Sequence, residues 1–418
     1  MSPTTRSPDA VLGDLGALLL DAGLSVTDVR GTLEQVAAAA APGIELTFAV
    51  LPQQVLVSRV GLAGATTIGT TVGTALTFRQ AAHASRLARR LETGRMDLRT
   101  APAHIDRIRA IRRRAPGLQR VLGGALLSAG LATLFRCPWW AVLLSFLVGA
   151  LVSAVIVATD RLRAAAAVVP FVVAFLSTVA VGAVAAALDF GTVPLFAVCA
   201  PVAILVPGAL ITNALLELTA ADIVAGASRL VYGIIMLAFM AAGIFAGAAV
   251  TGLRVDPHSA ALVGETAQVT GHGGWEAVPP LWLSWAGVVV LAIGIGLSFG
   301  AGFRLTLATV LVMTSTYATL MLLTPITGST VATGIAAALL FLAARILERI
   351  ASAVPATVSF QPAFLLLVPG TVGLVALASF DAQALAAAPL IFVSLCIGTK
   401  IGALIADATR ISQPAPAG

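Results

Sequence analysis

The tetrapeptide Leu205-Val206-Pro207-Gly208 lies in the middle of an apolar stretch, and the same four residues recur as Leu367-Val368-Pro369-Gly370, 162 positions later (369 minus 207). A proline inside a helix removes one backbone hydrogen bond and clashes with the preceding turn, so each copy predicts a broken or kinked helix. In a lipid bilayer, the freed backbone groups need partners in the protein interior or in a water-filled cavity. Paired interruptions in matching halves are typical of the substrate path of a transporter.

The composition excludes a wholly water-soluble protein. Of the 418 residues, 59% are hydrophobic and 11% are charged, and the mean hydropathy is +1.00. The formal charge of +6 reflects short basic loops and a basic run ahead of the first long apolar segment. That run holds Arg107, Arg109, Arg112, Arg113, Arg114 and Arg120. We interpret it as a topology signal and membrane-surface anchor, and expect no nucleic-acid partner.

Neither a cleaved leader nor disulfide chemistry is expected. Acidic residues interrupt the first apolar residues of the chain, which argues against a signal peptide. The cysteines are odd in number and far apart, and they lie in or beside apolar segments, at Cys137, Cys199 and Cys396. This pattern favours packing over disulfide or metal chemistry.

Residues 1–115 carry amphipathic rather than wholly apolar segments, which predicts a small α/β domain in the cytoplasm. Ser25 precedes Asp28 as a loose capping box, and Pro42-Gly43 ends the helix that follows. Two β-branched runs on either side of Pro52-Gln53 predict a hairpin. The expected elements are helices over 9–21, 26–41, 79–91 and 102–114 and strands over 44–51 and 54–60. The Gly/Thr-rich stretch 61–77 receives no assignment.

The remaining chain predicts a polytopic α-helical membrane protein. About 20 helical residues cross the hydrocarbon core of a bilayer. Ten segments reach about that length, over 118–135, 139–159, 165–187, 193–216, 224–250, 281–300, 303–322, 325–345, 357–378 and 384–405. A polar extracytoplasmic loop over 254–280 separates one five-helix repeat (116–253) from another (281–408), and 409–418 forms a tail. Because five is odd, the second repeat enters the membrane from the opposite side, so the repeats are inverted.

The arginines of the loops indicate the orientation. With the N-terminus inside, the cytoplasmic connections hold Arg161, Arg163, Arg304, Arg345 and Arg349. Only Arg136 and Arg254 fall in predicted outside loops, together with His258 and His272. The excess of arginine in these connections predicts a multi-pass membrane protein with both termini in the cytoplasm. The outside histidines match no metal-ligand spacing, so we expect no metal and no cofactor.

The stretch from Leu205 through Thr212-Asn213-Ala214, Glu217, Asp222 and Gly226 to Arg229 resembles the threonine/serine exporter family of bacterial membrane proteins. The resemblance extends to 18–57 and to the helix that ends at His104-Ile105-Asp106-Arg107-Ile108. It implies a cytoplasmic domain, ten spans in two related halves, and export of small polar metabolites driven by the proton motive force. Threonine and serine are the implied substrates, or succinate in relatives whose halves are separate polypeptides.

The interrupted spans give the candidate substrate site. Pro207 and Gly208 would break the fourth span, and Pro369 and Gly370 the ninth, leaving backbone groups that suit a carboxylate or an ammonium group. Packing kinks without function are the alternative. Thr212 and Asn213, about one turn past the proline, are candidate substrate contacts or interhelical hydrogen-bonding groups.

The acidic residues that follow are the candidate proton-coupling or gating groups. Glu217 and Asp222 lie where the fourth span meets the cytoplasm, and Arg229 lies about two turns into the fifth, where an acid would offset its charge. A purely structural ion pair explains the same pattern. In the second half, Gln361 is a candidate substrate contact. Position 375, which aligns with Asn213, is valine, so the first half carries most of the polar groups.

The leading hypothesis is therefore a secondary exporter that works by alternating access. A dicarboxylate exporter and a channel are the alternatives within transport. An intramembrane enzyme is disfavoured because all four histidines lie outside the expected spans, at His83, His104, His258 and His272. No phosphate-binding loop appears in residues 1–115, so ATP chemistry would need another protein. The cytoplasmic domain is also a candidate sensor that gates transport, and a homo-oligomer is left open.

Overall fold

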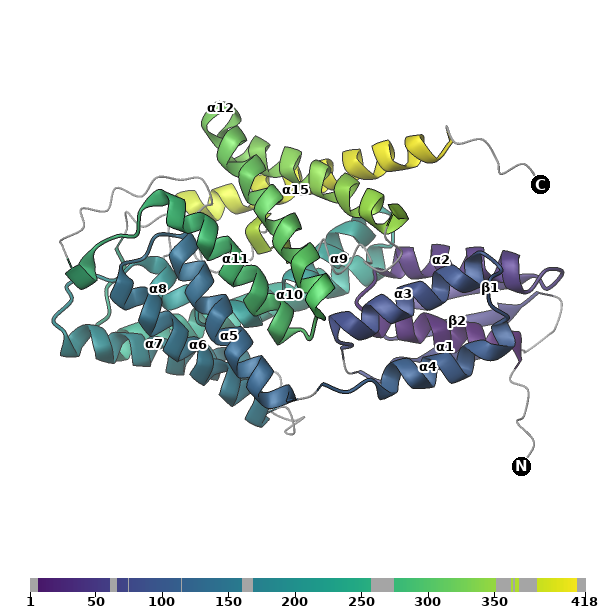
Figure 1. Cartoon of the computed structure of the whole chain (residues 1–418), viewed down its shortest axis with the longest axis horizontal. Helices are drawn as coiled ribbons and strands as arrows, with labels where there is room; N and C mark the ends of the chain where they lie inside the picture. The colour runs from purple at the N-terminus through teal and green to yellow at the C-terminus, as the bar shows by residue number, and fades with distance from the viewer. Residues whose placement is uncertain are drawn as a thin grey trace. The chain divides into compact units, whose positions relative to one another are not determined.

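The computed structural model describes residues 7–60, 66–73, 75–113, 115–159, 168–256, 274–350, 362–363, 365–367 and 382–411. Helices dominate this part of the chain (Figure 1). The fold forms two compact units. The first unit joins the N-terminal domain, 1–114, to the segments 212–230 and 344–358, and the second unit contains the remaining residues.

The N-terminal domain is a three-stranded antiparallel sheet covered on one face by helices. The helices are α1 (Pro8–Asp21), α2 (Val26–Ala40), α3 (Phe78–Glu92) and α4 (Ala101–Ala110), with a 3₁₀ turn η1 (Leu98–Thr100) before α4. The strands are β1 (Leu46–Leu51), β2 (Gln54–Arg59) and β3 (Thr66–Thr70), in the order β1-β2-β3. The expected helices and hairpin are confirmed, while β3 lies within the stretch that the sequence left unassigned.

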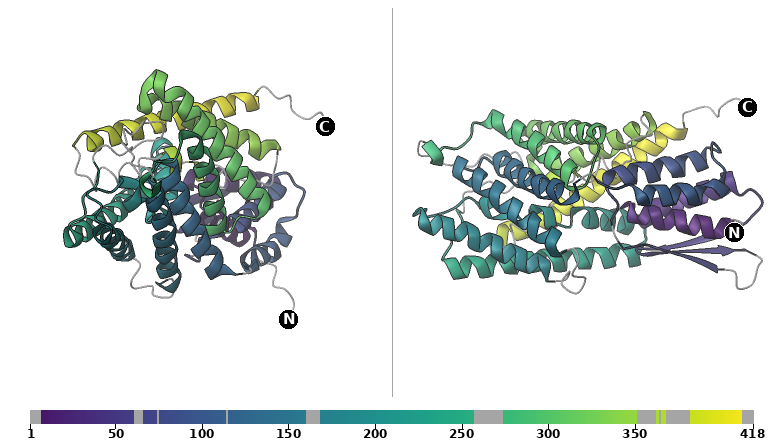
Figure 2. Two further views of the ribbon diagram at one scale, coloured as in Figure 1. Left: turned by 60° about the vertical axis from the view of Figure 1, so that its left-hand side comes forward. Right: turned by 60° about the horizontal axis from the view of Figure 1, so that its bottom comes forward.

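Buried and exposed side chains alternate along the strands, and the buried ones lie on the face of the sheet that the helices cover. Val50, Val55 and Val57 are buried, and they belong to paired positions that face α1 and α2. Figure 2 shows the helices on one side of the sheet and none on the other. Gly69 of β3 and Gly13 of α1 let strand and helix touch, because a Cβ on Gly69 would meet the Gly13 carbonyl. A side chain at Gly69 would therefore push the strand away from the helix.

The second unit is built mainly from apolar helices. They begin with α5 (Pro116–Leu134), α6 (Trp139–Thr159) and α7 (Val169–Ala187), followed by the short pieces α8 (Leu195–Cys199) and η3 (Ala203–Leu205). Then come α9 (Gly208–Thr219), α10 (Ile223–Thr251), the turn η4 (Gly274–Glu276), α11 (Leu281–Ser298), α12 (Phe303–Ile350) and α15 (Ala382–Ile411). Of these, most of α9, the start of α10 and the end of α12 belong to the first unit. Within the described ranges, five helices are long and apolar enough to cross a membrane, namely α6, α7, α10, α11 and α12.

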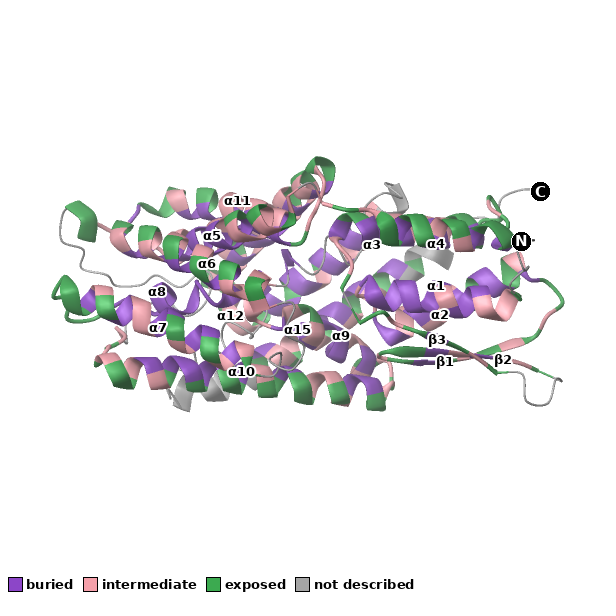
Figure 3. Cartoon of the chain, turned by 90° about the horizontal axis from the view of Figure 1, so that it is seen from below, coloured by how far each residue is buried: buried purple, intermediate pink, exposed green. Residues whose placement is uncertain are grey.

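Exposed residues recur along these helices (green in Figure 3), and many of them are large and apolar. Examples are Val231 and Ile234 of α10, which are 56% and 52% exposed, and Leu322 of α12, which is 70% exposed. Water would penalise such continuous exposure, whereas the hydrocarbon of a bilayer is its natural surrounding. The chain is therefore an integral membrane protein with several spans.

The element α12 consists of two helices that meet at Gly328, where φ is 79° and ψ is 160°. We expected two segments, over 303–322 and 325–345, with the boundary directly before Pro325. The helix instead continues past the proline and ends at the glycine, because Gly328 adopts a left-handed φ that side chains disfavour. The two expected helices exist, with a boundary several residues further along the chain.

Glycines set the packing of α5 against α11, the first helices of the two expected repeats. A Cβ on Gly123 would meet the Gly294 carbonyl at 2.9 Å, and one on Gly294 would meet the Gly123 carbonyl at 2.8 Å. Gly130 and Gly287 form the same reciprocal contact, at 2.9 Å in both directions. Such close approach of backbones is how small residues hold membrane helices together.

Candidate functional site

The fourth expected span is broken, as the proline and glycine predict. The 3₁₀ turn η3 ends at Leu205, and Val206 leaves helical geometry with a ψ of 123°. The Ile211 N–H donates to the Pro207 carbonyl at 3.0 Å, so α9 starts anew after the proline. Pro207 itself is buried. The interruption therefore lies inside the protein, where a membrane helix can tolerate it.

A tight turn joins α9 to α10. Ala221 adopts a left-handed φ of 64°, and the Asp222 N–H donates back to the Glu217 carbonyl at 2.9 Å. This is the Schellman pattern that ends many helices. Gly226 of α10 packs against α9, since a Cβ there would lie 2.9 Å from the Ala214 carbonyl. The turn and the close packing make α9 and α10 a hairpin whose facing side chains can pair.

Glu217 and Arg229 form a buried ion pair across this hairpin. Arg229 Nη1 lies 2.9 Å from Glu217 Oε1, and their side chains are 11% and 0% exposed. The pairing that the sequence predicted for Arg229 is confirmed. Burying both charges is costly, and removal of one partner from such a pair typically costs about 3–5 kcal/mol because the other charge is left alone.

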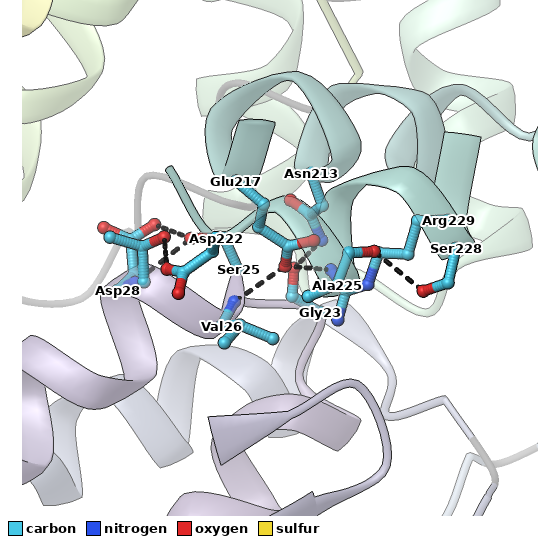
Figure 4. Close-up of polar contacts among 11 residues, drawn as sticks. Gly23, Ser25, Val26, Asp28, Asn213, Glu217, Asp222, Ala225, Ser228 and Arg229 are labelled. Atoms are coloured by element: carbon cyan, nitrogen blue, oxygen red, sulfur yellow. Dashed lines mark hydrogen bonds and ion pairs between the residues drawn. The ribbon is translucent and has the colours of Figure 1, made fainter. Parts of the chain in front are cut away.

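The same carboxylate holds the start of α2. The Val26 N–H donates to Glu217 Oε1 at 2.8 Å, as Figure 4 shows. Val26 is the first residue of α2, and the Ser25 side chain caps that helix by accepting from the Asp28 N–H. The first N–H groups of a helix lack partners within the helix and attract negative charge. Glu217 therefore supplies the anion that the start of α2 favours.

Two further contacts bind the hairpin to the N-terminal domain. Asn213 Nδ2 donates to the Gly23 carbonyl at 2.9 Å. Asp222 accepts from Thr27 Oγ1 and from Arg30 Nη2, each at 2.7 Å. We call these contacts, with that between Val26 and Glu217, the hairpin–α2 contact. Partial burial opposes ionisation of Asp222, but the hydrogen bonds from Thr27 and Arg30 and the charge of Arg30 outweigh it and hold the pKa of Asp222 below its usual value.

A third segment of the chain reaches the same turn of α2. Arg345 Nη2, near the end of α12, lies 3.0 Å from Asp28 Oδ1. Asp28 also accepts from Ser25 Oγ at 2.8 Å. The start of α2 is thus held by one residue of α12 and three of the α9–α10 hairpin. All of these residues belong to the first compact unit.

One atom in this network has no partner. Glu217 Oε2 is buried and accepts no hydrogen bond from any described residue. Both donors, the Val26 N–H and Arg229 Nη1, converge on Oε1. A buried acceptor left without a partner costs about 1–3 kcal/mol. The carboxylate is therefore tightly held at one oxygen and unsatisfied at the other.

The sequence-predicted site residues fall into separate groups. The structure brings Asn213, Glu217, Asp222 and Arg229 together, and it places Pro207 and Gly208 at the start of the same helix, α9. Thr212 is buried beside Asn213 on α9. Gln361, Pro369 and Gly370 lie outside the described residues, and so does the interruption expected in the ninth span.

Sequence reasoning missed the partners contributed by the N-terminal domain and by α12. They are Gly23, Val26, Thr27, Arg30, Asp28 and Arg345. One signal for part of this set was available. The Ser25–Asp28 capping box predicted the start of α2, and a helix start attracts acids such as Glu217.

Comparison with known proteins adds the family. Residues 10–251 match the family model ThrE, described as "Putative threonine/serine exporter". The chain belongs to the threonine/serine exporter family. The match includes both sides of the hairpin–α2 contact and the broken fourth segment, and it ends where α10 ends. Membership in this exporter family supports a transporter. No curated protein and no solved structure matches the chain.

Proposed function

We propose that this member of the threonine/serine exporter family exports small polar metabolites, with threonine and serine first, as a secondary transporter driven by the proton motive force. The observation that carries the proposal is the interruption at Val206–Pro207 inside an apolar segment of a family member. The new helix start at Gly208 suits a carboxylate, and the carbonyls before the break suit an ammonium group. Amino acids carry both groups.

Alternating access would require two related halves that move about the broken segments. The glycine contacts support this relation. Gly123 and Gly287 are 164 positions apart, and so are Gly130 and Gly294 (287 minus 123, 294 minus 130). Gly123 packs on Gly294, and Gly130 packs on Gly287. A two-fold axis between inverted repeats would produce this reciprocal pairing. On this proposal ten spans cross the bacterial plasma membrane, with both termini inside.

Glu217 is the proposed proton-coupling group, with Asp222 and Arg229 in gating roles. Glu217 lies near the end of α9, the same helix that begins at the break. Glu217 lies ten positions after Pro207 (217 minus 207), so the continuous helix that starts at Gly208 spans about 15 Å from the break to Glu217. A change in the ion pair between Glu217 and Arg229 would therefore shift the helix whose other end borders the proposed substrate path. A single helix, α9, would thus couple protonation of Glu217 to the opening of the proposed substrate path.

The test is efflux of threonine, serine and succinate from preloaded proteoliposomes, with and without an imposed proton gradient. We expect gradient-dependent efflux of both amino acids. Efflux of succinate alone would replace the amino acids by dicarboxylates as the substrate class. Rapid, gradient-independent leakage of all three would favour a channel, and absence of any flux would overturn the transport proposal.

A further inference from the structure

The ion pair at the hairpin–α2 contact has the geometry of an occupied carboxylate site. A guanidinium nitrogen and a helix-start N–H meet one carboxylate oxygen, at 2.9 Å and 2.8 Å. These are the two donor types that proteins use most readily for a free carboxylate. The carboxylate that fills the site here belongs to the chain itself. Figure 4 shows Glu217 pointing between Val26 and Arg229.

The fit of Glu217 in this site is incomplete. Its side chain is 0% exposed, yet Oε2 finds no donor among the described residues. Buried carboxylates with a permanent structural role normally have partners on both oxygens. A guanidinium offers five N–H donors in a planar fork, enough to hold both oxygens of a carboxylate that approaches in line with it. A free carboxylate in this site can therefore accept hydrogen bonds at both of its oxygens, whereas Glu217 accepts them at one.

We propose that Arg229 and the Val26 N–H form a second recognition site for the carboxylate of the transported metabolite, separate from the helix start at Gly208, and that Glu217 occupies this second site when no metabolite is bound. The proposal rests on the proposed export function. Metabolite and Glu217 compete for the same donors, and a bound metabolite frees Glu217 from α2. Since the two ligands present the same chemical group, the space that the Glu217 carboxylate leaves accommodates that of the metabolite.

Neighbouring contacts let this exchange occur without separating the domain from the hairpin. Asn213 holds the Gly23 carbonyl, and Asp222 holds Thr27 and Arg30, through atoms that do not touch Glu217. These contacts keep the start of α2 in place while Glu217 leaves. Arg229 and Glu217 are positioned by the packing of α9 on α10 at Gly226, which is likewise independent of the carboxylate.

The experiment is calorimetric titration of the purified full-length protein in detergent. The probes are L-threonine, succinate, and threoninol, the amino alcohol that lacks the carboxylate. Glu217→Gln should bind threonine or succinate about tenfold more tightly than the unmodified protein, since the competing charge is gone and both donors remain. Neither protein should bind threoninol. Adding Arg229→Gln to the Glu217→Gln variant removes a donor without leaving a buried charge unpaired, and should abolish the gain.

Asp21→Asn is the matched control. Asp21 is another buried carboxylate of the first unit; it accepts from the Val72 N–H at 3.2 Å and lies 3.7 Å from Arg109 Nη2. Its neutralisation should leave the affinities unchanged. Unchanged or weaker binding of both acids by Glu217→Gln would overturn the inference, and so would equal binding of threoninol. The outcome is independent of flux, so an unmodified protein that exports threonine while Glu217→Gln gains no affinity would refute this site alone.

Discussion

Asn213 donates its side-chain amide to the carbonyl of Gly23 across 190 residues of sequence, at 2.9 Å. The sequence indicated Asn213 as a candidate contact for a substrate, or as a group that joins helices. The structure places it against the loop that leads into α2. A residue on the helix that starts at the break is therefore bound to the N-terminal domain. Domain and broken helix are linked by a hydrogen bond as well as by charge.

Replacement of Asn213 by Asp should loosen this link. The variant keeps the size of the side chain but replaces the donating amide by a carboxylate oxygen, so the hydrogen bond to the Gly23 carbonyl is lost. We expect a loss of about 1–3 kcal/mol in the local opening free energy. Hydrogen exchange measured on peptides covering residues 20–30 should accelerate accordingly. Exchange in β1, which pairs with β2, serves as the internal reference, and equal protection of residues 20–30 in both proteins would contradict the prediction.

Asp222 should make the stability of the hairpin–α2 contact depend on pH. The pKa of Asp222 is lower in the folded protein than in the unfolded chain. The carboxylate therefore stabilises the contact at pH values above the ordinary aspartate pKa of about 4. That contribution is lost as the pH falls through the lowered pKa. Asp222→Asn should remove this dependence and cost about 0.5–1 kcal/mol at neutral pH, because Arg30 is 37% exposed and solvent screens the pair.

The measurement for Asp222 is thermal unfolding between pH 3 and pH 7, with the pH range set about the ordinary aspartate pKa. Glu92→Gln, at the exposed end of α3, is the control and should leave the acid profile unaltered. If Asp222→Asn unfolds with the same pH dependence as the unmodified protein, the contacts of Asp222 with Thr27 and Arg30 do not stabilise the fold as predicted.

Gly208 and Gly226 should respond differently to alanine. A Cβ on Gly208 has open space around it, whereas a Cβ on Gly226 would meet Leu218 and the Ala214 carbonyl. Pro207→Ala combined with Gly208→Ala should therefore leave the unfolding temperature nearly unchanged and reduce threonine efflux about tenfold or more, since it favours a continuous helix at the break. Gly226→Ala should cost about 1–3 kcal/mol of stability through overpacking.

Unfolding temperature and efflux are measured on the same preparations of these variants. Equal loss of stability and flux in the Pro207/Gly208 variant would show that the break serves packing. A continuous helix with undiminished export would remove the break from the transport mechanism.

Ala221 should gain stability on replacement by glycine. Its φ of 64° is left-handed, which is unfavourable for a residue with a Cβ by about 1 kcal/mol. Ala221→Gly relieves this strain, and we expect a higher unfolding temperature. Ala227→Gly, within α10, should lower it by the usual cost of glycine in a helix, about 0.5–1 kcal/mol. A lower unfolding temperature for Ala221→Gly would mean that chain flexibility outweighs the strain.

Local features of this fold could be predicted from sequence because local chemistry determines them. Ser25 and Asp28 predicted the start of α2, Pro52-Gln53 predicted the hairpin, and Pro207 predicted the break. The boundary near Pro325 was misplaced because a proline can be accommodated within a kinked helix, while the left-handed φ falls on Gly328.

Long-range partners escaped prediction. Glu217 was singled out as an acid near a membrane boundary, and an acid was expected beside Arg229 without a choice between Glu217 and Asp222. The hydrogen bond between Glu217 and Val26 could not be predicted, because 191 positions separate the two residues and periodicity carries no information about such tertiary contacts. Strand β3 was missed for a related reason, since its short, glycine-containing run gains its order from pairing with β2 and from packing on α1.

The most direct test of the proposed export mechanism is proton movement driven by threonine itself. Proteoliposomes preloaded with threonine and a pH-sensitive dye are diluted into threonine-free buffer at equal pH, with the membrane potential clamped by potassium and valinomycin. We expect the lumen to acidify as threonine leaves, and Glu217→Gln to release threonine without acidification. Threonine efflux from the unmodified protein with no change in lumenal pH would contradict this expectation.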